Sequence, residues 1–286
     1  MGIESGVLFA FGALLCWAFG DFFIQRSTRK IGDVESLAFI GIIGSIGLLP
    51  FIIKDFSLLN QSNTLFLLTL GVVTFIMAMF DFEALKKGKL SIINVVMETE
   101  LPVTIALGFI FFAETLSFLQ SIIIAFIFIG IVLIATKSFS HWKRTLEKGV
   151  LIALVAAGLM GVVNFLTAAS AKTISPLLAI WFPWVVFTIM CLFYIWRKEG
   201  TLRFIKDAKK FKLLVLLMGI FDTAAWIFYA FAVMESSISI ITAITESYPA
   251  IAIFLGFYFN KEKINWHQWV GAGIALSASF ILGVLI

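Results

Sequence analysis

The sequence consists of long apolar runs separated by short polar segments. Each run is about 20 residues long, which is the length that an α-helix needs to cross the hydrocarbon core of a bilayer. Connections as short as 113–117 and 260–265 join only antiparallel neighbours. The pattern therefore predicts ten transmembrane helices in a compact bundle. They cover residues 6–24, 34–53, 64–85, 90–112, 118–136, 149–171, 175–196, 213–234, 238–259 and 266–285.

The composition supports this prediction. Of the 286 residues, 61% are hydrophobic and 13% are charged, and the mean hydropathy is +1.07. An average soluble domain has about 45–50% apolar and about 25% charged residues. The difference excludes a disordered chain, a collagen-like chain and a nucleic-acid-binding protein. We expect an all-α integral membrane protein that is surrounded by the lipid bilayer and has no nucleic acid as a partner.

The basic residues are concentrated in alternate loops. Of the 21 Lys and Arg residues, 19 lie in the loops after the odd-numbered helices, and only Lys54 and Lys172 lie on the opposite side. Short cytoplasmic loops are enriched in Lys and Arg. The bias therefore predicts that both termini lie outside the cytoplasm, in a multi-pass protein of the plasma membrane.

The two halves of the sequence resemble each other. Two repeats of five helices explain this similarity, and we place them at residues 1–143 and 144–286 of a single domain. Because five is odd, the second repeat enters the membrane from the opposite side, so the repeats are inverted. Identical residues recur at an offset of 143 and then of 148, in the pairs Glu4/Glu147, Gly6/Gly149, Gly71/Gly219, Ser91/Ser239, Glu98/Glu246, Glu114/Glu262 and Gln120/Gln268.

Several carboxylates lie within the predicted helices, where no Lys or Arg is deep enough to neutralise them. Each central charge costs about 2.5–3.5 kcal/mol, so these groups must be protonated, hydrogen-bonded or hydrated. Glu98 and Glu246 occupy equivalent repeat positions, and Pro102 and Pro249 follow them. Because proline removes a backbone hydrogen bond and bends a helix, we expect two kinked helices beside a central site. Glu100 is about 200° from Glu98 around a continuous helix and is the weaker candidate.

Helical spacing adds aromatic and polar residues to this site. Positions i, i+4 and i+7 share a face of a helix, which places Asp222, Trp226 and Tyr229 together. The same spacing pairs Trp17 with Asp21. The complete set of candidate substrate-binding residues is Trp17, Asp21, Glu98, Asn164, Trp181, Asp222, Trp226, Tyr229, Glu246 and Tyr248.

Other residue types give weaker signals. Trp181 lies near the end of its helix, where tryptophan is more often a residue of the membrane interface. Cys16 and Cys191 lie within apolar runs, and His141 and His267 lie near loops. The sequence therefore predicts neither a disulfide framework nor a metal site.

The junction of the fourth and fifth helices carries the segment Phe112-Ala-Glu114-Thr-Leu followed by Gln120. With the inverted five-helix repeats and the polar, proline-bearing fourth and ninth helices, it resembles the drug/metabolite transporter superfamily, above all its EamA-type carriers. The resemblance implies a site between the halves, where the fourth and ninth helices face each other. It also implies that the fifth and tenth helices pack at the periphery, and that the protein is an exporter. Eukaryotic members are usually drawn with cytosolic termini, whereas the charge bias predicts the reverse.

Acidic groups beside aromatic rings suit a cation, and a buried carboxyl group can load and release a proton near neutral pH. We therefore predict a secondary active transporter that moves a small cationic or zwitterionic amine or amino acid by alternating access. Protons would be coupled through Glu98 and Glu246. We expect no cofactor, no enzymatic activity, and a monomer or a weak dimer. A sugar or nucleotide-sugar carrier of the same superfamily, and a channel or lipid scramblase, remain as alternatives.

Overall fold

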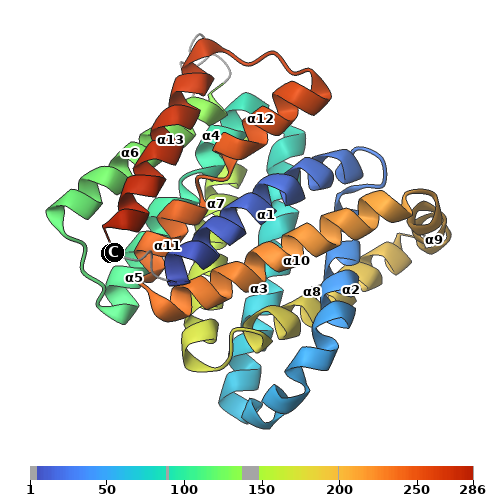
Figure 1. Cartoon of the computed structure of the whole chain (residues 1–286). Helices are drawn as coiled ribbons and strands as arrows, with labels where there is room; N and C mark the ends of the chain where they lie inside the picture. The colour runs from blue at the N-terminus through green and yellow to red at the C-terminus, as the bar shows by residue number, and fades with distance from the viewer. Residues whose placement is uncertain (1–4, 88–89, 137–147, 199, 286) are drawn as a thin grey trace.

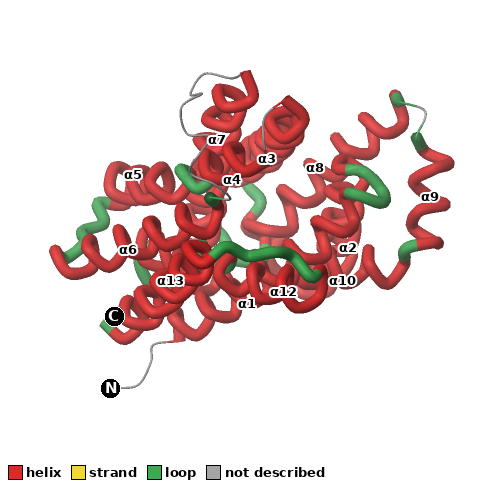
Figure 2. Tube along the Cα trace, turned by 90° about the horizontal axis from the view of Figure 1, so that it is seen from above, coloured by secondary structure: helices red, strands yellow, loops and turns green. Residues whose placement is uncertain are grey.

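The computed structural model describes residues 5–87, 90–136, 148–198 and 200–285, which form helices joined by loops (Figures 1 and 2). Ten segments of these residues are long and apolar enough to span a membrane. The helices are α1 (Ser5–Thr28), α2 (Asp33–Ile52), the 3₁₀ helix η1 (Ile53–Leu58), α3 (Gln61–Lys87), α4 (Leu90–Met97), α5 (Glu100–Phe112), α6 (Phe118–Ala135), α7 (Lys148–Thr173), α8 (Leu178–Arg197), α9 (Thr201–Lys210), α10 (Lys212–Glu235), α11 (Ile238–Thr245), α12 (Pro249–Asn260) and α13 (Trp266–Val284).

The predicted all-α membrane fold with ten spans is confirmed, with local differences. The fourth and ninth spans are each divided into two short helices, α4 with α5 and α11 with α12. The second span continues beyond α2 into η1. The predicted boundary between residues 143 and 144 lies outside the described residues.

A further helix, α9, forms in the segment between the predicted spans 175–196 and 213–234. Phe204 is the buried anchor of this helix and stacks on Phe39 of α2, with ring centroids 4.1 Å apart. Lys206 and Lys209 point outward and are exposed. The helix lies on the outside of the bundle, at the end opposite α5 and α6 (Figure 2). The contact between Phe204 and Phe39 therefore attaches α9 to α2.

The packing of the helices follows a two-fold pattern. Helix α1 packs against α10, and their repeat counterparts α7 and α3 also pack together. The pairs α2 with α8 and α6 with α13 each join a helix to its own counterpart. Equivalent helices therefore make equivalent contacts, as inverted repeats related by an axis in the membrane plane require.

Helices α6 and α13 show this symmetry in detail. A Cβ on Gly130 would lie 2.8 Å from the carbonyl oxygen of Gly271, so the missing side chains let the two backbones cross closely. At the helix starts, Gln120 and Gln268 complete equivalent capping boxes, with Ser117 and Asn265 respectively. The fifth and tenth spans are thus paired, as the resemblance implied.

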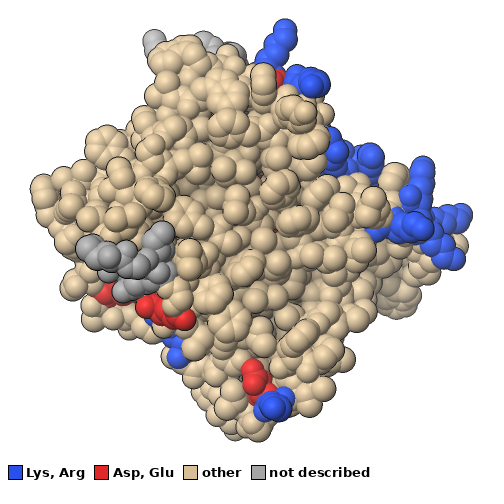
Figure 3. Space-filling view, in the orientation of Figure 1, with Lys and Arg blue, Asp and Glu red and all other residues tan. Residues whose placement is uncertain are grey.

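Charged side chains lie mostly at the ends of the bundle. On the face shown in Figure 3, Lys and Arg gather at one end, over α9 and near the α12–α13 connection, and a few charges of both signs mark the other end. The broad band between the two ends is uncharged on this face. Large apolar side chains such as Ile110, Phe111 and Phe118 are exposed, which suits contact with lipid.

Candidate functional site

Two interrupted helices form the centre of the site. Helix α4 ends at Met97 and α5 begins at Glu100, while α11 ends at Thr245 and α12 begins at Pro249. These interruptions occupy equivalent positions in the two repeats. Tight-turn hydrogen bonds close part of each gap, such as Tyr248 N to Thr245 O at 3.1 Å. Half-helix ends at membrane depth are typical of the binding sites of transporters with inverted repeats.

The two prolines start the second half-helices. Pro249 is the first residue of α12 and Pro102 is the third residue of α5. The first turn of a helix tolerates proline because its N–H groups have no partner within the helix. The expected bends coincide with short interruptions of the regular α-helix, at which Thr99, Glu246 and Tyr248 keep right-handed helical backbone angles.

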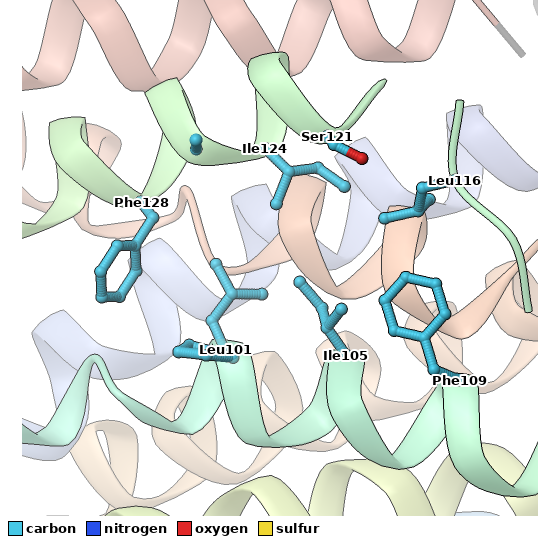
Figure 4. Close-up of a pocket in the computed structure, with 9 residues that line it drawn as sticks. Leu101, Ile105, Phe109, Leu116, Ser121, Ile124 and Phe128 are labelled. Carbon is cyan, nitrogen blue, oxygen red and sulfur yellow. The ribbon is translucent and has the colours of Figure 1, made fainter. Parts of the chain in front are cut away.

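Pro102 does not face the carboxyl cluster described below. It is exposed and lines a groove of about 330 Å³ between α5 and α6 (Figure 4). Ile105, Phe109 and Phe128 line the same groove, in which Ser121 is the only polar side chain. This groove suits contact with lipid tails better than recognition of a polar ligand.

Carboxyl groups from both repeats meet at the interruptions. The side chains of Glu100 and Glu246 share a hydrogen bond. Because an ionised carboxylate only accepts hydrogen bonds, this contact requires a proton on one of the two. Glu98 lies close enough to both Glu246 and Asp21 for like-charge repulsion. The interruption of the helix at Glu98 brings Glu100 to the same site, whereas on a continuous helix Glu100 would point away from Glu98.

Two further acids approach from α1 and α10. Asp21 of α1 interacts with the side chain of Tyr248. Asp222 of α10 is buried and interacts electrostatically with Asp21. A Cβ on Gly20 would lie 3.4 Å from the backbone nitrogen of Asp222, so α1 and α10 approach closely beside these acids.

Aromatic rings form one wall of the site. The indoles of Trp17 and Trp226 meet edge to face, with centroids 5.1 Å apart. Trp17 also contacts Tyr229 at 5.7 Å and Tyr248 at 6.3 Å. The Tyr229 hydroxyl lies 3.2 Å from the backbone carbonyl of Asn164 and 3.0 Å from the Thr242 hydroxyl. Aromatic rings from α10 and from the α11–α12 interruption thus pack around Trp17 of α1.

Asn164 of α7 connects this wall with the acids. Its Nδ2 donates to Glu246 Oε1 at 3.4 Å. Its Oδ1 is buried and has no hydrogen-bond partner among the described residues. The ion pairs found in the described part of the chain, Lys87–Glu83 and Arg203–Asp207, lie elsewhere. Among the described residues named for this site, none is basic, so they offer oxygen acceptors to a ligand.

Trp181 lies outside this cluster of acids and aromatic rings. Its Nε1 donates to the carbonyl of Ser45 at 2.9 Å, and its ring packs against Phe56 of η1. One turn further along α8, Trp184 contacts Trp226 at 5.7 Å. The structure thus joins the other nine candidate residues to one cluster and adds Glu100 and Trp184. The Trp181/Trp184 spacing was visible in the sequence, but the inward-facing member of the pair was not.

Comparisons with known proteins bear on the whole chain. The model of the EamA-like transporter family matches twice, at residues 4–136 and 147–284. A solved structure described only as "Crystal structure of protein" superposes with a TM-score of 0.79 at 14% sequence identity, over 99% of this chain and 98% of that one. At this identity the likeness shows the fold alone. The search of the curated proteins found no significant match.

Proposed function

Since the chain belongs to the EamA-like transporter family, we propose that it exports a small cationic or zwitterionic amine or amino acid by alternating access. The observation that carries this proposal is the group formed by the buried Glu246 and Asn164 and the half-buried Glu100, which presents acceptors at two interrupted helices. The proposal agrees with the two inverted repeats, whose relative rocking would open a central site to each side in turn.

An ammonium group fits the chemistry of these acceptors. It has three donors and a positive charge, and a buried acceptor without a partner costs about 1–3 kcal/mol. Asn164 Oδ1 is such an acceptor, beside the Glu246 carboxyl. The faces of Trp17 and Trp226 would add cation–π attraction, worth about 0.5–2 kcal/mol. A neutral sugar would leave the acids without compensation.

Coupling to protons follows from competition for the same carboxyl groups. Glu98 and Glu246 are the predicted proton carriers, and the hydrogen bond between Glu100 and Glu246 adds Glu100. A protonated pair attracts a cation less than an ionised pair. If either the proton or the substrate occupies the site, the two exchange across the membrane, and an inward proton gradient drives export of the amine.

The orientation is proposed from the distribution of Lys and Arg. The 19 to 2 bias supports an orientation in the plasma membrane with both termini on the side opposite the cytoplasm. Single cysteines at Lys206 and at Lys54, in a background without Cys16 and Cys191, test it. A membrane-impermeant maleimide should label whole cells at position 54 and only opened cells at position 206. The reverse pattern would overturn the orientation.

A ligand screen followed by a flux assay tests the function. Purified protein is heated with amines, amino acids, neutral sugars and nucleotide sugars, because a bound ligand raises the melting temperature. We expect amines or amino acids to stabilise the wild type but not Glu246→Gln. In proteoliposomes, Glu98→Gln and Glu246→Gln should abolish flux driven by a pH gradient, while the exposed Glu262→Gln serves as the control. Stabilisation by sugars that both variants retain would favour the sugar carrier instead.

A further inference from the structure

A second groove, of about 390 Å³, lies on the surface of the bundle between α3 and α8. Its walls are large apolar side chains, and one of the residues that line it is charged. The lining residues are Phe75 of α3 and Ile189, Met190, Phe193, Tyr194 and Arg197 of α8. The lining of the groove between α5 and α6 is apolar apart from Ser121, so the two grooves differ in what they can bind.

The groove begins where α3 and α8 cross. A Cβ on Gly71 would lie 2.6 Å from the Cβ of Val186, so the two helices touch at this point. Phe75 follows Gly71 by about one helical turn, and Met190 follows Val186 by the same distance. Because both residues line the groove, the helices diverge from their crossing towards Arg197.

The groove ends at the surface of the membrane. Ile189, Phe193 and Arg197 are spaced by four residues, so they share one face of α8, and all three are exposed. At a rise of 1.5 Å per residue, Arg197 lies about 12 Å beyond Ile189 along the helix axis. Arg197 is the last residue of the span Leu178–Arg197, where the polar headgroups begin. The groove is therefore apolar at membrane depth and cationic at the membrane surface.

Two positive charges lie at this end of the groove. Neither Arg197 nor the adjacent Lys198 forms an ion pair in the described part of the chain. Lys198 Nζ lies 5.9 Å from the centroid of the Tyr194 ring, so a second cation adjoins the groove. The segment 197–212 contains seven basic and two acidic residues, and Figure 3 shows Lys and Arg gathered over α9. This end of the groove thus favours an anion.

An anionic phospholipid matches both parts of the groove. Its acyl chains are apolar, and its phosphate lies at the level of the membrane surface. A guanidinium group can form paired hydrogen bonds with phosphate oxygens. A soluble anion would leave the apolar walls unused. A phospholipid with a zwitterionic headgroup would bring a further cation to a place that already holds two.

We propose that the groove between α3 and α8 binds one anionic phospholipid, with its phosphate on Arg197 and an acyl chain along Phe75, Ile189 and Phe193. Helix α3 belongs to the first repeat and α8 to the second, so the bound lipid contacts both repeats. The proposal concerns the outer surface of the protein and does not depend on the substrate of the central site.

Titration with two lipids tests the charge at the groove. Delipidated protein in detergent is titrated with phosphatidylglycerol and with phosphatidylcholine of the same acyl chains, and bound lipid is counted by native mass spectrometry. We expect the wild type to bind the first phosphatidylglycerol at least about fivefold more tightly, since one cation near the membrane surface contributes about this factor. Arg197→Gln should lose this preference. Arg29→Gln removes an exposed arginine from the α1–α2 connection and should retain it.

A second pair of variants tests the apolar wall. Ile189→Trp fills part of the groove with a larger apolar side chain and should weaken the binding of both lipids. Ile110→Trp makes the same change on exposed surface outside this groove and should leave the binding unchanged. Because both positions are exposed, the lipid-free variants should melt at the same temperature as the wild type.

The proposal is refuted if the wild type binds both lipids equally. Equal losses in Arg197→Gln and Arg29→Gln would also refute it, since they would show a general attraction to the basic end of the protein. If Ile189→Trp keeps full binding, the acyl chain does not lie in the groove. If inorganic phosphate alone raises the melting temperature as much as the lipid does, and only when Arg197 is present, the site binds a soluble anion instead.

Discussion

Glu100 and Glu246 belong to different repeats, and their carboxyl groups share a hydrogen bond at the point where both polar helices are interrupted. One proton between two carboxyl groups can be exchanged for one cation. The contact thus links the binding chemistry to the relative position of the repeats, since moving one repeat changes the distance between the two groups.

Glu100→Gln should uncouple transport from protons without unfolding the protein. The amide can still donate to Glu246, but one titrating group is gone. We expect flux driven by a pH gradient to fall at least about tenfold, while exchange of labelled for unlabelled substrate at a fixed pH continues. In the wild type, ligand affinity should rise with pH because fewer protons compete for the carboxyl groups. In the variant, ligand affinity should depend less on pH. An unchanged pH-driven flux in proteoliposomes would contradict this role.

Trp226→Phe should weaken the binding of cations selectively. Phenylalanine retains a ring but attracts a cation less than an indole does, a difference of about 0.5–1 kcal/mol or about two- to fivefold in Kd. Titration by calorimetry or thermal shift measures the change. Trp196→Phe alters an exposed ring at the end of α8 and is the control. Equal losses in the two variants would show that the indole of Trp226 has no special part in binding.

Glu114→Gln should destabilise the start of α11. The Glu114 carboxylate accepts from Ile238 N at 2.5 Å, Ser239 N at 2.9 Å and Ser239 Oγ at 2.6 Å. A charged acceptor at a helix N-terminus stabilises the unpaired N–H groups there. Because the neutral amide is a weaker acceptor, we expect the free energy of unfolding of the variant to fall by about 1–3 kcal/mol, which is measured as a lower melting temperature. The exposed Glu262→Gln should lower the melting temperature less. An equal change in both variants would argue against stabilisation of the start of α11 by Glu114.

Gly130→Ala should disturb the pairing of α6 with α13. The new methyl group would lie 2.8 Å from backbone atoms of Ala275 and Gly271, which cannot move aside as a flexible side chain can. We expect a loss of about 1–3 kcal/mol from overpacking, measured by thermal unfolding in detergent. Gly273→Ala places its methyl group where no atom lies within 4 Å and should be neutral. Similar melting temperatures for both variants would refute the close crossing.

The spans themselves were predictable because lipid imposes their length. The ranges 118–136 and 266–285 were predicted where the structure has Phe118–Ala135 and Trp266–Val284. The helix α9 was not predictable from span length, because the sequence does not show that Phe204, its buried residue, packs on the ring of Phe39. The segment also contains Leu202, Ile205 and Ala208, but its apolar residues do not form a run long enough to span a membrane.

Part of the candidate site was also predictable. The repeat relation between Glu98 and Glu246 located the interruptions, since a carboxylate near a proline is unusual in an apolar run. Glu100 was set aside because its angle was calculated on an unbroken helix, and the interruption removes that premise. The contact between Trp184 and Trp226 could not be predicted at all, because it joins α8 to α10 only in the packed structure.

The two-fold pattern of packing divides the helix pairs into two kinds. The pairs α2 with α8 and α6 with α13 map onto themselves under the symmetry, whereas α1 with α10 maps onto α3 with α7. When the protein reverses the side to which it opens, a self-related pair meets the same partner in both states, and the other two pairs exchange their environments. Substitutions between α6 and α13 should therefore change stability equally in both states. Substitutions between α1 and α10 should shift the balance between the two directions of opening.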